Sequence, residues 1–99
     1  MHASQLCAGI RWRVRVEFEY EGLHRVVEPY LHGTNDKHQL LRAVQVSGQS
    51  RSGRLGMGKL WIVEKMKNVR CSDEKFEPSD PDYNPIDQAI PNIHCRIER

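Results

Sequence analysis

A glycine-rich segment that ends in lysine has nearly the spacing of a nucleotide-binding P-loop. Residues 53–59 spell Gly-x-x-x-x-Gly-Lys, a pattern in which backbone N–H groups and the lysine hold phosphate oxygens. A P-loop needs Ser or Thr at the next position to bind magnesium, but this chain has Leu60. A P-loop is also followed directly by a helix. In this chain the aliphatic and aromatic residues 60–63 favour a strand instead. We therefore exclude a P-loop ATPase.

A less specific phosphate site is still predicted around the same loop. Arginine forms forked contacts with phosphate, and serine hydroxyls and flexible backbone add donors. Two strand-end residues beside Gly33 are expected at the rim of the same surface, and the flanking strands add cations. The predicted binding residues are Tyr30, His32, Arg42, Ser50, Arg51, Arg54, Lys59 and Lys65. The alternative is an ordinary solvated loop.

No arrangement of residues indicates catalysis. His24, His32 and His38 each lie near a turn and have no local partner that would make a nucleophile–base pair. The serines lack the Gly-x-Ser-x-Gly elbow. We therefore predict that the protein is not an enzyme, with chemistry on nucleotides kept only as a minor alternative.

The three cysteines favour a cytoplasmic, reducing compartment over a secreted disulfide scaffold. Cys7, Cys71 and Cys95 are odd in number and far apart, without a Cys-x-x-Cys pair, so Cys71 is expected to be a buried free thiol. Zinc bound by Cys71 with His94 and Cys95 is disfavoured, because adjacent residues of a strand point to opposite faces. No metal or cofactor is expected. The start of the chain lacks a signal-peptide pattern and no apolar run is long enough to span a membrane, so a cytoplasmic protein is expected.

Charge is unevenly distributed along the chain. Residues 37–70 hold eight basic residues and one acidic residue, a net +7, whereas residues 71–92 hold six acidic residues and one lysine, a net −5. This asymmetry predicts a basic surface for an anionic partner, with an acidic segment that folds over it or faces elsewhere. The alternative is a solvated surface whose two halves neutralise each other.

These residues must be positioned by a small β structure. Apolar residues at 12, 14, 16, 18 and 20 alternate with charged residues, which predicts a half-buried strand. Turn residues 21–22 and apolar runs at 24–31, 40–46, 59–65, 69–71 and 93–97 predict further strands, with Tyr20 and Trp61 in the core. Residues 1–11 form a short helix or an irregular lead-in, and the prolines after Phe76 exclude long regular elements there. The predicted fold is mainly β, a small bent antiparallel sheet, barrel or sandwich.

The strand pattern resembles the opening of a WYL domain, a small β module usually found in bacterial transcriptional regulators. The resemblance rests on Ile10, Val16-x-Phe18-x-Tyr20, Gly22, Arg25-x-Val27-x-Pro29-Tyr30, residues 40–43 and 60–66, and Phe76. It implies an SH3-like (Sm-like) barrel, a ligand-sensing role, and contact of Arg42 and neighbouring cations with a nucleotide or single strand. The chain departs from the family where Gln39, Leu40 and Leu41 stand in place of the Trp-Tyr-Leu tripeptide.

Together these observations predict a WYL-like module at residues 1–76 and an acidic, proline-rich tail at residues 77–99 that packs on the same domain. The predicted function is non-enzymatic: a sensor or accessory factor in transcription regulation that binds a nucleotide or single-stranded nucleic acid, with no membrane partner. The alternative is a protein-interaction or assembly subunit that uses a sheet edge and the acidic tail. Its partner is then another protein or a second copy of the chain in a homodimer.

Overall fold

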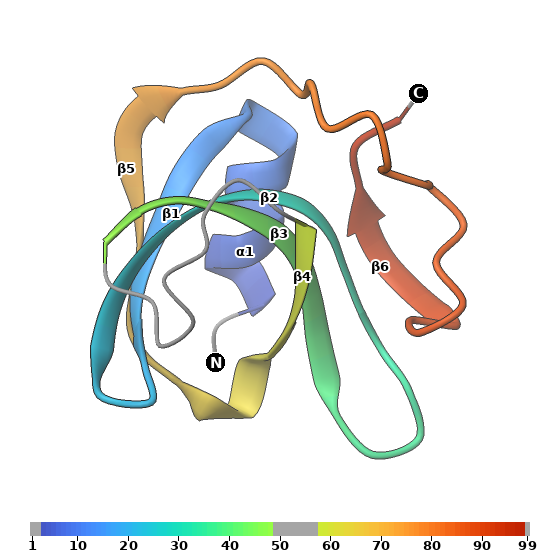
Figure 1. Ribbon diagram of the computed structural model, residues 1–99. Coiled ribbons are helices and arrows are strands. Elements are labelled where there is room, and N and C mark those ends of the chain that lie inside the picture. Colours follow the sequence, from blue (N-terminus) through green and yellow to red (C-terminus); the bar gives the residue numbers. More distant parts are fainter. Residues whose placement is uncertain (1–2, 49–57, 99) are drawn as a thin grey trace.

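The fold is described by a computed structural model that covers residues 3–48 and 58–98 (Figure 1). One helix is followed by strands, with a 3-10 turn and an irregular segment at residues 76–91 between them. The elements are α1 (Ala3–Trp12), β1 (Val14–Tyr20), β2 (Leu23–Thr34), β3 (Gln39–Gly48), β4 (Gly58–Ile62), the 3-10 turn η1 (Val63–Lys65), β5 (Met66–Lys75) and β6 (Asn92–Arg96).

The strands form one antiparallel sheet in the order β4-β3-β2-β1-β5, with β6 added against β2. The first part of β2 pairs with β1 and its last residues pair with β6, while β3 runs along both parts. Register shifts near Val26 and Pro29 bend this long strand, as β-bulges do, and the sheet curves around a common centre (Figure 1). The predicted mainly β fold, with a short N-terminal helix and a bent antiparallel sheet, is confirmed.

The alternating pattern of the first strand holds only from Val14 onward. Val16 and Phe18 are buried as predicted. Trp12, however, is the last residue of α1 and is 64% exposed, so its assignment to the apolar face of the strand is wrong. The physical reason is Arg13, whose φ of +54° is the left-handed conformation that ends a helix and redirects the chain.

The core is built around an aromatic cluster, of which the sequence predicted Tyr20 and Trp61. The rings of Phe18 and Tyr20 meet Trp61 edge-on, with centroid distances of 5.3 and 5.0 Å, an orientation favoured by ring quadrupoles. The Trp61 indole donates to the carbonyl of Ala43, and the Tyr20 hydroxyl accepts from the Ile62 N–H. Trp61 is therefore a core residue as predicted, and Tyr20 lies at the core's edge.

The irregular segment after β5 is tied to the sheet by two tyrosines. The Tyr30 hydroxyl accepts the N–H groups of Ser79 and Asp80 at 3.0 and 3.1 Å. The Tyr83 hydroxyl donates to the Ile97 carbonyl at 2.7 Å. These contacts hold the segment over β2 before β6 returns to the sheet.

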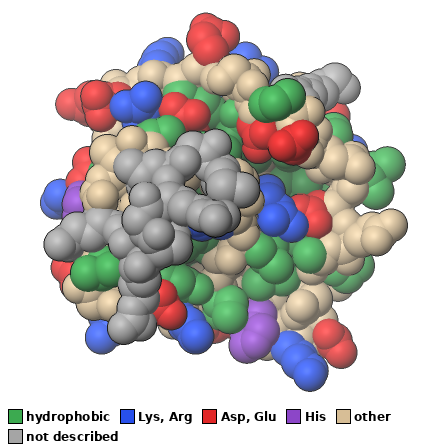
Figure 2. Space-filling view, in the orientation of Figure 1, with side chains coloured by type: hydrophobic (Ala, Val, Ile, Leu, Met, Phe, Trp, Pro, Cys, Tyr) green, Lys and Arg blue, Asp and Glu red, His purple; other side chains and the backbone are tan. Residues whose placement is uncertain are grey.

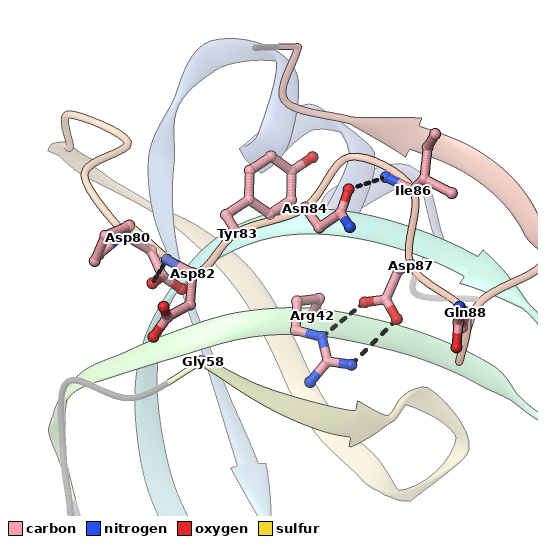
Figure 3. Close-up of a pocket in the computed structure, with 10 residues that line it drawn as sticks. Arg42, Gly58, Asp80, Asp82, Tyr83, Asn84, Ile86, Asp87 and Gln88 are labelled. Atoms are coloured by element: carbon pink, nitrogen blue, oxygen red, sulfur yellow. Dashed lines mark hydrogen bonds and ion pairs between the residues drawn. The ribbon is translucent and has the colours of Figure 1, made fainter.

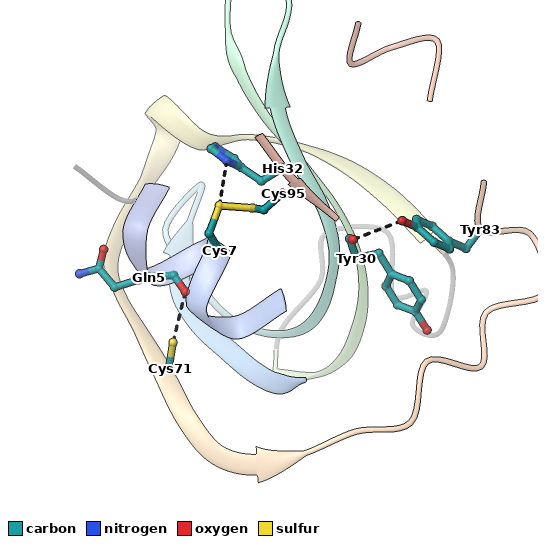
Figure 4. Close-up of a disulfide and its surroundings, with 7 residues drawn as sticks. All are labelled: Gln5, Cys7, Tyr30, His32, Cys71, Tyr83 and Cys95. Carbon is teal, nitrogen blue, oxygen red and sulfur yellow. Dashed lines mark hydrogen bonds between the residues drawn. A yellow bond between two sulfur atoms is a disulfide. The ribbon is translucent and has the colours of Figure 1, made fainter. Parts of the chain in front are cut away.

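A disulfide joins α1 to β6 through Cys7 and Cys95 (Figure 4). The cysteine pattern predicted no disulfide scaffold, and this bond was missed because cysteines separated by 88 residues give no local signal of their proximity. Cys71 is free but exposed on β5, where its thiol donates to the Gln5 carbonyl, so the prediction of a buried thiol is wrong. The cysteines thus no longer argue for a reducing compartment. Across the residues described, no helix has the length and apolarity that crossing a bilayer requires.

Candidate ligand-binding sites

Two of the predicted binding residues lie in the interior. Tyr30 and His32 are each 1% exposed, so their expected place at a rim is wrong. The bent end of β2 that carries them is covered by the tail, β6 and α1. The Tyr30 hydroxyl is committed to the tail backbone, and the His32 ring lies against the disulfide, with Nδ1 3.8 Å from the Cys7 sulfur.

The remaining predicted residues are divided between two strands, a turn and the undescribed loop. Arg42 on β3 and Lys59 on β4 belong to neighbouring strands, since Lys59 faces Ala43 in the register. The Lys59 ammonium lies 5.7 Å from the Trp61 ring centroid, and Lys65 is exposed in η1. Ser50, Arg51 and Arg54 lie outside the described residues. The described residues therefore do not bring the whole predicted set together in one site.

A pocket of about 740 Å³ lies between the tail and strands β3 and β4 (Figure 3). Its lining includes three acidic residues of the tail, Asp80, Asp82 and Asp87. Arg42 is the one basic residue among the lining residues of the described chain, and it is paired: Nε donates to one Asp87 oxygen at 2.8 Å and Nη2 to the other at 3.3 Å. The acidic segment thus folds onto Arg42, one of the two arrangements that its charge predicted.

The electrostatics of this pair favour an ionised aspartate. Partial burial acts to raise the pKa of Asp87, but hydrogen bonds from Arg42 and the Ala89 N–H, together with the Arg42 charge, hold that pKa below its usual value. Asp87 is therefore a carboxylate at neutral pH and occupies the guanidinium fork as a bound oxyanion would.

Substitution of Asp87 tests this contact. We expect Asp87→Asn to lower the free energy of unfolding by about 1–2 kcal/mol at pH 7, because it removes a charged, forked hydrogen-bond acceptor. Since the folded pKa of Asp87 is depressed, its contribution is present above the unfolded pKa of about 3.9 and is lost as pH falls through the folded pKa. Urea denaturation of both proteins at pH 7 and pH 3 should show the difference shrinking in acid.

The matched control is Asp82→Asn, which removes the same charge from the same pocket. Asp82 has no side-chain ion pair in the described chain, so its substitution should change stability by less than about 0.5 kcal/mol. If the two variants lose equal free energy of unfolding, Asp87 acts only through its negative charge and not through its two hydrogen bonds with Arg42.

A second surface surrounds the end of α1, and we call its residues Arg11, Trp12, Arg13 and Lys75 the Trp12 patch. These residues, with Phe76 and Glu77, line an open groove of about 370 Å³. The β1–β5 pairing places Lys75 opposite Val14, and the Phe76 N–H donates to the Arg13 carbonyl at 2.9 Å. The helix end and the end of β5 are thereby fixed side by side.

The Trp12 patch combines an uncovered indole with unpaired positive charge. None of its three cationic side chains makes an ion pair or hydrogen bond within the part of the chain that the structure describes. The other arginines among the described residues are paired, as Arg15 is with Glu28 and Arg70 with Glu17. An exposed aromatic ring can stack on a planar ligand while neighbouring cations bind its charges.

Sequence reasoning missed the Trp12 patch because it placed Trp12 on the buried face of a strand. The available signal was the Arg-Trp-Arg sequence itself, at a possible helix end. Lys75 was not predictable as its neighbour, since only the pairing of β1 with β5 brings it there.

The chain was compared with protein-family models, with curated proteins and with solved structures, and none of them matches it. The resemblance to WYL domains therefore remains a prediction.

Proposed function

We propose that this protein is a non-enzymatic module that binds single-stranded nucleic acid on the Trp12 patch. One observation carries the proposal: an indole that is 64% exposed is bordered by three cations without partners in the described chain. An unstacked base has a planar face for the indole, and its backbone supplies phosphates for the cations. Stacking on an aromatic side chain is worth about 1–3 kcal/mol per base and depends little on sequence.

A purely structural explanation covers only part of this arrangement. Cations near the C-terminus of a helix interact favourably with its dipole, which accounts for Arg11 in the last turn of α1. It does not account for Trp12, whose ring gains nothing from exposure to water, or for Lys75, which comes from another element. A ligand that uses both ring and cations explains all three.

Arg42 has a different role in this proposal from the one the sequence suggested. Its guanidinium already holds Asp87, and the surrounding pocket is mainly acidic, which disfavours a polyanion. Figure 2 likewise shows acidic and basic side chains interspersed on the face it presents, outside the grey atoms. We therefore assign Arg42 to anchoring the tail.

The test is fluorescence anisotropy of labelled oligo(dT) and oligo(U) at low and physiological salt. We expect saturable binding that weakens with salt, with a slope of about −2 in log K against log salt if three phosphates are neutralised. Trp12→Ala, Arg11→Gln, Lys75→Gln and Arg13→Asn should each weaken it. Asn is chosen at position 13 because it tolerates the left-handed backbone there.

Two controls locate the binding face. Lys67→Gln removes the same charge from the exposed other end of β5, and Arg42→Ala removes the predicted contact. Affinity that falls in these variants as much as in Lys75→Gln, or that is absent in the unmodified protein at low salt, would overturn the proposal.

A second candidate function, protein assembly, is favoured by the edge of β5. Within the described residues β5 pairs only with β1 and ends the sheet, so its other edge has backbone groups available to another strand. Light scattering coupled to gel filtration tests it. A dimer that persists at high salt and is broken by a proline in β5 would support strand pairing, and a monomer at all concentrations would exclude self-assembly.

A further inference from the structure

Two sulfurs and one imidazole from three different elements meet where α1 packs against β2 and β6 (Figure 4). Cys7 lies on α1, His32 on β2 and Cys95 on β6, and one ligand atom from each lies within 4.8 Å of the other two. We propose that Cys7, His32 and Cys95 form a zinc-binding site when the disulfide is reduced, so that the protein exchanges a disulfide for a bound Zn²⁺.

The ligand chemistry suits this ion. Zinc in proteins takes thiolate sulfur at about 2.3 Å and imidazole nitrogen at about 2.0–2.1 Å in tetrahedral geometry, which spaces neighbouring ligand atoms by about 3.5–3.8 Å. His32 Nδ1 is already 3.8 Å from the Cys7 sulfur. The two sulfurs would move apart from their bond, and the 5.7 Å between the Cα atoms of Cys7 and Cys95 leaves room for this by side-chain rotation.

A second observation concerns His32 alone. Its side chain is almost fully buried, and Nε2 makes no hydrogen bond of normal geometry in the described chain, although the Gln39 side chain lies close. Nδ1 faces a disulfide sulfur, which has no proton to donate and is a weak acceptor. Burial of polar atoms without partners is costly. Coordination through Nδ1 would give that nitrogen a strong partner in place of the disulfide sulfur, and it would fix the ring proton on Nε2, the nitrogen that donates in a zinc-bound imidazole.

The fourth position of a tetrahedral site is open to water or to a further protein ligand. His94 is next to Cys95 in the chain, and in a regular strand their side chains would point to opposite faces. The β2–β6 register shifts between Ile93 and Cys95, however, and the His94 ring centroid lies 5.4 Å from that of His32. His94 is therefore the candidate for the fourth zinc ligand, and a His94 variant can test it. Cys71 lies elsewhere, with its thiol on the Gln5 carbonyl, and is not among the three.

The exchange is balanced in two steps. A dithiol reductant transfers two electrons and two protons to the Cys7–Cys95 disulfide, which becomes two thiols while the reductant becomes a disulfide. Binding of Zn²⁺ then releases the two thiol protons, because the ligands are thiolates. In the reverse direction a disulfide oxidant accepts two electrons from the two thiolates and, with two protons from water, becomes a dithiol, while the Cys7–Cys95 bond reforms and the ion is released.

The experiment uses the full chain with Cys71→Ser, so that the only thiols are those of the site. After reduction and removal of the reductant, Co²⁺ is added as a spectroscopic probe, and Zn²⁺ affinity is measured by competition with a chelating dye. We expect one metal per chain, with thiolate charge-transfer and tetrahedral d–d bands. These bands should disappear in Cys95→Ser and weaken in His32→Gln, and the unreduced protein should bind none.

Folding is followed by circular dichroism in each sample. If the reduced protein unfolds without metal, recovery of the native spectrum on addition of Zn²⁺ supports the site, and failure to recover it overturns the proposal. A folded, reduced protein that gives no tetrahedral cobalt spectrum overturns it as well, as does equal binding by Cys95→Ser. Loss of intensity in His94→Ala would identify the fourth ligand, and an unchanged spectrum would assign that position to water.

Discussion

Removal of the disulfide in Cys7→Ser/Cys95→Ser will lower the free energy of unfolding by about 4 kcal/mol. The bond closes a loop with a sequence separation of 88 residues, and chain-entropy models assign a stabilisation of this size to so long a loop. A small domain has a modest core, so the loss is a large part of its total stability. The melting temperature should fall by roughly 20 °C.

Thermal melts with a chelator present, with and without reductant, measure this effect without interference from metal. Cys71→Ser is the matched control, because Cys71 is exposed and unpaired with another cysteine, and its melting temperature should stay within a few degrees of the unmodified protein. A melt of the unmodified protein that does not respond to reductant would show that the disulfide does not support the fold.

Gly33→Ala is expected to cost about 3 kcal/mol of stability, through a steric conflict between two strands. Gly33 pairs with Leu40 on β3 and with Ile93 on β6. A Cβ at this position would overlap the Asn92 carbonyl and the Ile90 side chain. Since backbone cannot yield as a flexible side chain does, β6 would have to move away from β2, an overpacking effect at the upper end of the usual range.

Gly22→Ala provides the comparison for chemical denaturation. Gly22 has φ of +75°, but a Cβ there meets nothing within 4 Å, so only the backbone preference is lost, about 1 kcal/mol. If the two variants lose equal stability, the close approach of β2 and β6 at Gly33 is not a constraint on the fold.

The strands were predictable because their signals are local. Val16 and Phe18 are buried where alternation placed them, Trp61 lies in the core, and the prolines of the tail exclude long elements as expected. Each of these outcomes depends on side-chain periodicity or on one residue's backbone restrictions, which the sequence displays directly.

The errors concern contacts between distant parts of the chain. Tyr30 was expected at a rim because it precedes a turn, but the tail covers it from 49 residues away. Cys7 and Cys95 are brought together only by the return of β6 to β2. Trp12 was misplaced for a local reason instead: one left-handed residue, Arg13, separates helix from strand.

For the candidate sites, the sequence predicted the types of residue that take part but not which of those residues contact one another. The charge runs predicted a basic surface and an acidic segment that either folds over it or faces elsewhere, and Arg42 was among the predicted binding cations. That Asp87 is its partner follows from how the tail packs beside β3. The cations around Trp12 are brought together by the pairing of β1 with β5 next to the end of α1. Charge composition alone cannot select one acid among several on a tail.

The most direct test of the central claim is the intrinsic fluorescence of Trp12 during titration with oligo(dT). The chain has two tryptophans, and Trp61 is only 2% exposed. A change in emission caused by stacking on an accessible ring therefore reports on Trp12. We predict saturable quenching that is reversed by salt and lost in Trp12→Phe, which retains the native circular dichroism spectrum. Unchanged emission at saturating oligonucleotide, or equal quenching in Trp12→Phe, would contradict the assignment of the Trp12 patch as the binding surface.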